Sequence, residues 1–157
     1  MIPPGKVIAK RQEGTQYAAL CFRRTAGQKP QVLLITSRGT GRWIPPKGWP
    51  IEGLSPAESA AQEALEEAGV TGQTYPAALG RYKYNRLKDR DKKKSSEAYI
   101  FALRVTAHRS DFKEKGQRRI QWFDQKTAAL LVREPKLRQI IADFDPDLLD
   151  SNVSTNR

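Results

Sequence analysis

One stretch of the chain carries a complete set of signals for a helix. Ser55 and Glu58 have the spacing of a capping box, and Pro56 falls at the first helical position, where its missing N–H costs nothing. Gly69 supplies the left-handed residue that commonly ends a helix. The sequence therefore predicts a helix over residues 56–68, and any fold of this chain has to place it.

The predicted helix has two different faces. At 100° per residue three of its four glutamates, Glu63, Glu66 and Glu67, fall within an arc of about 100°. A separate arc holds small or apolar residues, namely Ala57, Ala61, Ala64, Leu65 and Ala68. We expect the alanine-rich side to pack against a sheet, with the carboxylates facing an open cleft.

The acidic face is unfavourable unless something compensates its charge. Like charges at i,i+3 and i,i+4 cost about 0.2–0.5 kcal/mol per pair, and acids in the last turn oppose the helix dipole by roughly 0.3–1 kcal/mol each. A solvated helix face is the simpler explanation. However, the chain has 28 Lys and Arg against 17 Asp and Glu, so basic residues were available for these positions. A bound cation would remove the conflict.

Three carboxylates beside the glycine- and proline-rich segment PPKGWPIEG suit a hard cation. Mg²⁺ prefers a few carboxylates together with waters and substrate phosphates, so we expect Mg²⁺, or Mn²⁺ in its place, and a phosphorylated ligand. With one histidine, His108, and one cysteine, Cys21, the chain offers no zinc cluster. We expect His108 at the surface and Cys21 buried as a small apolar residue.

The remaining pattern predicts a mixed sheet covered by helices on both faces, an α/β fold. The expected strands are residues 17–23 and 31–36, which form a hairpin, followed by 79–86, 98–105 and 120–123. The expected further helices are 127–132 and 135–144, the second with an apolar stripe. The basic stretch LKDRDKKKSS is expected at a hairpin tip.

The length of 157 residues favours one domain over residues 1–150, with residues 151–157 as a flexible tail. Neither a signal peptide nor a membrane span is recognisable, so no membrane partner is expected and the cytoplasm is the default location. The net charge of +11 favours polyanionic ligands without selecting one. The sequence leaves the oligomeric state open.

The segment that begins at Gly48 resembles the signature of the Nudix hydrolases: a glycine, five residues, a glutamate, seven residues, then Arg-Glu-apolar-x-Glu-Glu-x-Gly-apolar. The matching residues are Gly48, Glu63, Ala64, Glu66, Glu67, Gly69 and Val70. Two positions depart from it: Leu54 replaces the first glutamate and Gln62 replaces the arginine, which in the family orients the metal-binding glutamates. Glu52 is a candidate substitute for the first glutamate.

The resemblance extends over residues 17–144, and the segments RWIPPKGW, LGRYKY and RRIQWF are similar to the diphosphoinositol polyphosphate and diadenosine polyphosphate phosphohydrolases. It implies an α/β/α sandwich and hydrolysis of a phosphoanhydride bond. It also implies that Glu63, Glu66, Glu67 and the carbonyl of Gly48 hold the metal. Glu66 is our first candidate for the catalytic base, and Glu63, Glu97 and Glu114 are alternatives.

Three cations just before the helix, Arg38, Arg42 and Lys47, are candidates for gripping substrate phosphates, with ordinary surface positions as the alternative. Arg118 and Arg119 are weaker candidates for the same task. Trp43 and Trp49 flank the same loop. Stacking on a ligand is one interpretation of both tryptophans, and packing is the stronger one for Trp43.

Two other functions stay open. The segment GRYKYNRLKDRDKKK interleaves aromatic and basic residues, as single-strand-binding surfaces do, and Tyr82 and Tyr84 have same-face spacing on a strand. Alternation on a half-buried strand explains the tyrosines equally well. The departures at Leu54 and Gln62 raise a further alternative, a Nudix fold that binds a nucleotide without turning it over.

Overall fold

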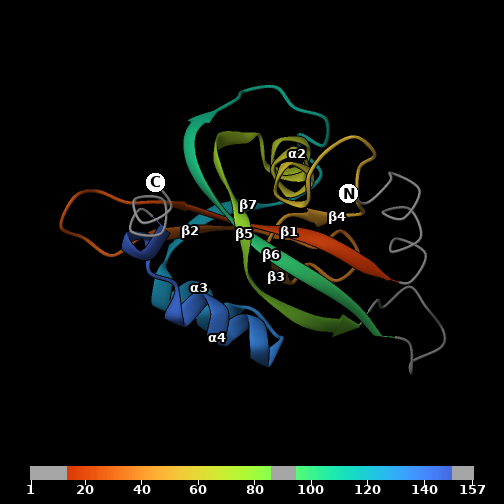
Figure 1. Ribbon diagram of the computed structural model, residues 1–157. Helices are drawn as coiled ribbons and strands as arrows, with labels where there is room; N and C mark the ends of the chain where they lie inside the picture. The colour runs from red at the N-terminus through yellow and green to blue at the C-terminus, as the bar shows by residue number, and fades with distance from the viewer. Residues whose placement is uncertain (1–13, 86–94, 150–157) are drawn as a thin grey trace.

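The computed structural model describes residues 14–85 and 95–149. A twisted sheet forms its centre, with one helix on one face and two helices on the other (Figure 1). This arrangement confirms the expected α/β sandwich and its mixed sheet. The expected hairpin tip at the basic stretch and the expected tail at 151–157 lie outside the described residues, apart from the last residues of the former.

The strands are β1 (Thr15–Arg23), β2 (Gln31–Thr36), β3 (Trp43–Ile44), β4 (Lys47–Gly48), β5 (Val70–Asn85), β6 (Ser95–His108) and β7 (Ile120–Asp124). The helices are α2 (Pro56–Ala68), α3 (Gln125–Leu131) and α4 (Pro135–Asp143). The main path through the sheet runs β3-β2-β1-β6-β5, while β4 pairs with β1 and β7 pairs with β2.

The sheet is mixed because its two central strands run in the same direction. β1 and β6 pair in parallel from Thr15 opposite Glu97 to Phe22 opposite Arg104. β1 and β2 form the predicted antiparallel hairpin, and β5 and β6 are also antiparallel. Parallel strands need a long connection, and here it includes α2 and β5.

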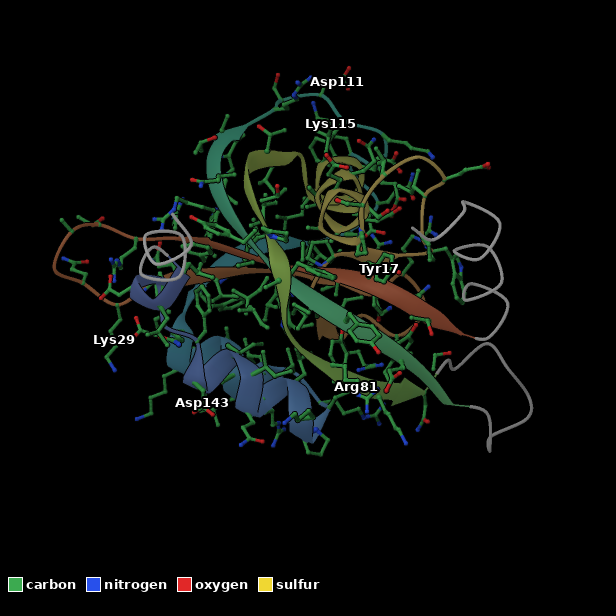
Figure 2. All side chains as sticks on the ribbon, viewed as in Figure 1. Tyr17, Lys29, Arg81, Asp111, Lys115 and Asp143 are labelled. Atoms are coloured by element: carbon green, nitrogen blue, oxygen red, sulfur yellow. The ribbon has the colours of Figure 1, made fainter. Side chains whose placement is uncertain are left out.

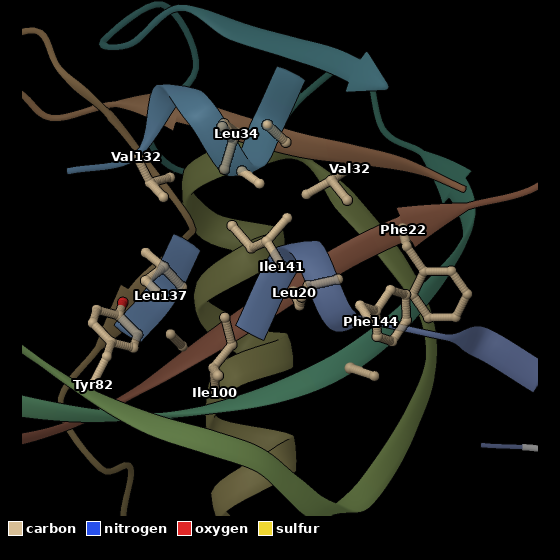
Figure 3. Close-up of a cluster of buried hydrophobic side chains, with 14 of the residues drawn as sticks. Leu20, Phe22, Val32, Leu34, Tyr82, Ile100, Val132, Leu137, Ile141 and Phe144 are labelled. Carbon is tan, nitrogen blue, oxygen red and sulfur yellow. The ribbon is translucent and has the colours of Figure 1, made fainter. Parts of the chain in front are cut away.

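Alternating residues of β1 contribute to two separate hydrophobic cores. Leu20 and Phe22 face the cluster under α3 and α4, which also contains Leu137 and Ile141 (Figure 3). The intervening residues, including Cys21, face the cluster under α2. Cys21 is completely buried, as predicted. This period of two fixes which face of the sheet each helix covers.

The strand predicted at 79–86 begins earlier than expected, at Val70. Its pairing with β6 shifts register after Thr71, between Thr74 and Ala78, and again before Gly80. These irregularities break the alternation that predicts a strand, and glycine and proline within the segment hide it further. β2 and α2 have the predicted bounds, and the other predicted elements differ from theirs by one to three residues at one or both ends.

In the described ranges, no helix is both long enough and apolar enough to span a membrane.

Candidate active site

The central helix α2 has the predicted bounds and the predicted caps. The Glu58 N–H donates to Ser55 Oγ at 3.2 Å, and the Ser55 N–H donates to Glu58 Oε1 at 2.9 Å. Gly69 adopts a left-handed conformation with φ of 72°, and its N–H donates to the Leu65 carbonyl. The capping box and the glycine stop therefore set where the glutamates lie relative to the sheet.

Glu67 faces a cavity with the other two glutamates, as expected, but it is more deeply buried than an open cleft implies. The buried residues of α2 are Ala57, Ser59, Ala60, Ala64, Glu67 and Ala68, while Ala61 and Leu65 are only half-buried. Glu67 is only 6% exposed, and polar partners compensate for the burial of its carboxyl group. The Lys47 N–H donates to its Oε1 at 3.2 Å, and Arg118 Nη2 lies 3.8 Å from its Oε2.

All three glutamates line one cavity of about 750 Å³. Its wall is strongly charged: the acids are Glu63, Glu66, Glu67 and Glu114, and the cations are Arg38, Arg42, Lys47, Lys113 and Arg118. The two aromatic side chains in the wall are Trp49 and Tyr84. The cavity is thus lined by α2, the loops and short strands before it, the connection between β6 and β7, and residues of β1 and β5.

Within this cavity Glu63 and Glu67 form a close pair. Burial is the main reason that the pKa of each carboxyl is raised, to about 8 for Glu67. The charge and the hydrogen bond of Glu63 raise the pKa of Glu67 further, whereas the hydrogen bond with Glu67 lowers that of Glu63, whose pKa the charges of Glu66 and Glu114 raise. Arg118 opposes the shift at Glu67. A proton shared between Glu67 and Glu63 would offset the repulsion between the two acids.

Gly48 makes room for this pair. A Cβ atom at residue 48 would lie 2.5 and 2.6 Å from the two carboxylate oxygens of Glu63. Gly48 itself lies on the short strand β4, opposite Tyr17 of β1. The glycine is therefore needed for the close approach of the Glu63 carboxylate to the backbone.

The third glutamate of the predicted metal site is held slightly apart. Gln62 Nε2 donates to Glu66 Oε2 at 2.9 Å, and Lys113 Nζ lies 3.6 Å from Glu66 Oε1. Across the part of the chain that the structure describes, no group of three or more His, Cys, Asp or Glu side chains is placed so that the group alone could hold a metal ion. The side chains are arranged as one close pair plus one neighbour.

This donor set fits a partly hydrated divalent cation. Mg²⁺ usually keeps several waters and takes one or two protein carboxylates together with substrate phosphates, so it needs no closed cage. Glu63, Glu66 and Glu67 gather negative charge at one part of the cavity, where a cation would compensate it. The residues present are therefore suited to Mg²⁺ or Mn²⁺.

The three predicted phosphate-binding cations all line the cavity, but they differ in their partners. Arg38 is 55% exposed and donates to Gln117 Oε1 at 2.9 Å. Arg42 Nη1 instead donates to the nearly buried Glu134 at 3.0 Å. Lys47 lies with Nζ 4.6 Å from the Tyr84 ring centroid, and burial lowers its pKa. Arg38 is thus the most accessible of the three.

The connection from β6 to β7 contributes more to the site than the sequence indicated. It is tied to the end of α2, because the Arg109 N–H donates to the Gly69 carbonyl at 2.7 Å and the Glu114 N–H donates to the Glu66 carbonyl at 2.9 Å. Figure 2 shows Asp111 and Lys115 on this segment beside α2. The segment brings Lys113, Glu114 and Arg118 into the cavity, and no sequence periodicity indicates such a contact.

Several other candidates lie elsewhere. Glu97 is on β6, 3.6 Å from Arg81. Trp43 packs edge-to-face on Phe123 at 4.9 Å, and the Arg119 guanidinium lies 5.2 Å from its ring, which confirms the packing interpretation of Trp43.

Three further residues are exposed. Glu52 and Leu54 are both at the surface, and so is His108, as predicted. His108 Nε2 accepts a hydrogen bond from Trp122 Nε1 at 3.1 Å.

Tyr82 and Tyr84 are buried, at 2% and 6% exposure. They share a face of β5 as expected, and the Tyr84 hydroxyl donates to Gln16. Neither ring is exposed for stacking on a base, so their alternation reflects a strand that faces the interior.

Comparison with known proteins agrees with this geometry. The family model described as the NUDIX domain matches residues 14–144. The chain belongs to the Nudix family. Its departures at Leu54 and Gln62 are therefore variations within a Nudix domain.

Curated Nudix relatives include diphosphoinositol polyphosphate phosphohydrolase 3-beta of Bos taurus, 35% identical over 120 residues, which cover 74% of this chain and 67% of the relative. Nudix hydrolase 21, chloroplastic, of Arabidopsis thaliana is 30% identical over 125 residues, covering 78% of this chain and 61% of the relative. The chain thus spans about three fifths of the length of such plant relatives.

Solved structures share the Nudix fold. The Ap4A hydrolase of C. elegans superposes with a TM-score of 0.62 at 18% identity, covering 85% of this chain and 97% of the other. The dihydroneopterin triphosphate pyrophosphohydrolase of E. coli gives a TM-score of 0.60 at 18% identity, with coverage of 83% and 94%. At these identities the likeness concerns the fold.

Proposed function

We propose that this Nudix chain is a Mg²⁺-dependent hydrolase that cleaves a phosphoanhydride bond in a polyphosphorylated small molecule. The substrate is of the dinucleoside polyphosphate or diphosphoinositol polyphosphate type, as in the names of its relatives. We expect Mn²⁺ to support the reaction in place of Mg²⁺. The observation that carries the proposal is the Glu63–Glu67 carboxyl pair in a cavity that five Lys and Arg side chains also line.

The acidic residues of the cavity are the proposed metal ligands and base. Glu63, Glu67 and the nearby Glu66, with the carbonyl of Gly48, are the proposed metal ligands. A divalent ion held there would neutralise phosphate oxygens and activate water. Glu66 is the proposed proton acceptor, because it lies beside the pair without being part of it. Glu114, which lines the same cavity, is the alternative base.

The cations are the proposed phosphate ligands. Arg38 offers an exposed guanidinium at the cavity, and Arg42 and Lys47 add positive charge deeper in the wall. A guanidinium binds phosphate oxygens in a two-pronged geometry, whereas an ammonium acts as a point charge. Such a lining favours a substrate with several phosphates over a neutral or singly charged one.

The test is a screen of phosphoanhydrides with identification of the products. Ap4A, a diphosphoinositol polyphosphate and simple nucleoside triphosphates would each be incubated with the protein and Mg²⁺. Product formation that requires Mg²⁺ and disappears in Glu67→Gln would support the proposal. No product from any of these compounds, with either Mg²⁺ or Mn²⁺, would contradict it.

A Nudix domain that binds without turnover is a second candidate, and one observation favours it. The signature arginine is absent, and the neutral Gln62 donates a hydrogen bond to Glu66 in its place. Such a protein would bind a nucleotide or polyphosphate in calorimetry but release no product in the same screen. A nucleic-acid-binding module would instead bind RNA with a steep salt dependence that Glu67→Gln leaves unchanged.

A further inference from the structure

We propose that Arg118 is a positioning residue that holds Glu67 and Glu114 in the cavity and replaces the cation missing at residue 62. This inference rests on the proposed function, since it assigns Arg118 a part in building the metal site. Arg118 lies far from the signature in sequence, just before β7, and nothing in the local pattern around it points to this task.

The contacts of Arg118 join two acids from different elements. Its Nη2 lies 3.1 Å from Glu114 Oε1 and 3.8 Å from Glu67 Oε2, and its Nε donates to Glu114 Oε1 at 3.2 Å. The three side chains are nearly buried, with exposed fractions of 8%, 8% and 15% for Arg118, Glu67 and Glu114. A guanidinium at this depth fixes carboxylates more strictly than a surface cation does.

The backbone around Arg118 is itself held in place. Arg118 Nη1 donates to the Thr36 carbonyl at 3.1 Å. The Arg119 N–H donates to Thr36 Oγ1 at 2.9 Å, and the Thr36 N–H donates to the Arg119 carbonyl at 3.0 Å. These bonds anchor the guanidinium to the end of β2, so it does not depend on α2 for its own position.

Gln62 does not take over this role. It donates one hydrogen bond to Glu66 and carries no charge. In the described part of the chain, the only cation within 4 Å of a Glu67 carboxylate oxygen is Arg118.

Direct phosphate binding explains Arg118 less well than positioning does. Its Nε, Nη1 and Nη2 groups all have protein partners, whereas Arg38, in the same cavity, is 55% exposed. A guanidinium already committed to two carboxylates and a carbonyl has little left for a ligand. We therefore assign phosphate binding to Arg38 and positioning to Arg118.

The experiment measures metal binding without substrate. Mn²⁺ affinity is determined by electron paramagnetic resonance for the full chain and for Arg118→Gln, Arg118→Lys and Arg119→Gln. Arg119→Gln removes the same charge one residue away, from a side chain that stacks on Trp43. The kcat and KM values for Ap4A and a diphosphoinositol polyphosphate are measured on the same proteins.

Loss of positioning should weaken Mn²⁺ binding and lower kcat by roughly 10–100-fold, with KM changed little. The weaker Mn²⁺ binding distinguishes positioning from a simple charge effect, because removing a positive charge by itself would tighten cation binding. Arg118→Lys should also show weaker Mn²⁺ binding and a lower kcat, because an ammonium group lacks the two-pronged donor geometry of a guanidinium. Arg119→Gln should resemble the wild type. Adding Gln62→Arg to Arg118→Gln should restore part of the loss.

Other results would overturn the inference. Unchanged or tighter Mn²⁺ binding in Arg118→Gln, or a rise in KM alone, would make Arg118 a bystander or a phosphate ligand. If Arg118→Gln does not fold, Arg118→Lys is the deciding variant. Wild-type Mn²⁺ affinity in Arg118→Lys would refute positioning by the guanidinium. A wild-type chain that binds no Mn²⁺ and hydrolyses nothing would refute the proposed function and this inference together.

Discussion

Gly48 and Glu63 are complementary in space: the carboxylate of Glu63 occupies the volume that a Cβ at residue 48 would need. A signature glycine and a signature glutamate, 15 residues apart on the chain, therefore meet at one point. The relationship can be tested without knowing the substrate.

Gly48→Ala should destabilise the protein by about 1–3 kcal/mol, because the added methyl group overlaps Glu63. In a Glu63→Ala background the same substitution should cost much less, since the clashing atoms are gone. Urea unfolding of the four proteins gives the coupling energy. Strictly additive effects would show that Gly48 serves some other purpose.

Glu67→Gln should lower hydrolysis at least about 100-fold and abolish the rise in Tm that Mg²⁺ produces, because it removes a proposed ligand. Thermal scans with EDTA and with Mg²⁺, together with product assays, check this. Glu58→Gln is the matched control on the same helix, since a glutamine also completes a capping box. Equal Mg²⁺ responses in both variants would exclude Glu67 as a ligand.

The stability of the metal-free protein should fall as pH rises from about 4.5 to about 8. The pKa of Glu67 is raised by burial to about 8, so the folded state keeps a proton that the unfolded state releases. Its stabilising contribution is complete below the unfolded pKa and is lost as pH rises through the folded one. The Tm of wild type minus that of Glu67→Gln, in EDTA, should decline over this range. Parallel curves would contradict the raised pKa.

Arg42→Met should lower the free energy of unfolding by about 3 kcal/mol, because it leaves the nearly buried Glu134 without its partner. The double variant Arg42→Met, Glu134→Leu should recover most of this loss. Denaturant titration gives both values. A variant of full stability but raised KM would instead mark Arg42 as a phosphate ligand only.

Ser55→Ala should cost about 1 kcal/mol, since it removes the side-chain acceptor at the start of α2. The midpoint of urea unfolding should fall while the m-value stays constant. An unchanged midpoint would mean that tertiary packing alone fixes the helix start.

Local signals in the sequence were sufficient for α2 and for the central hairpin. Ser55, Pro56 and Gly69 define a helix through contacts within a few residues, and the alternation in β1 and β2 is undisturbed. The early part of β5 was missed because its register shifts interrupt the alternation. The sequence therefore predicts those elements whose geometry depends on contacts between residues close together in the chain.

The candidate site was predictable only in part for the same reason. The glutamates of α2 share a helix, so their proximity follows from the pitch. The burial of Glu67 depends on Arg118 and on the Lys47 N–H, which approach from other elements. The partner that occupies Arg42, Glu134, lies far along the chain. Such contacts are set by the path of the sheet, which no spacing in the sequence reveals.

The parallel pairing of β1 with β6 has a consequence for how the protein is made. On a translating ribosome, β1 and α2 emerge long before β6, so β1 waits with one side unpaired until the second half of the chain arrives. Arg118 emerges later still. A nascent chain cut short after α2 would carry Glu63, Glu66 and Glu67 and yet lack both the middle of its sheet and the guanidinium beside Glu67.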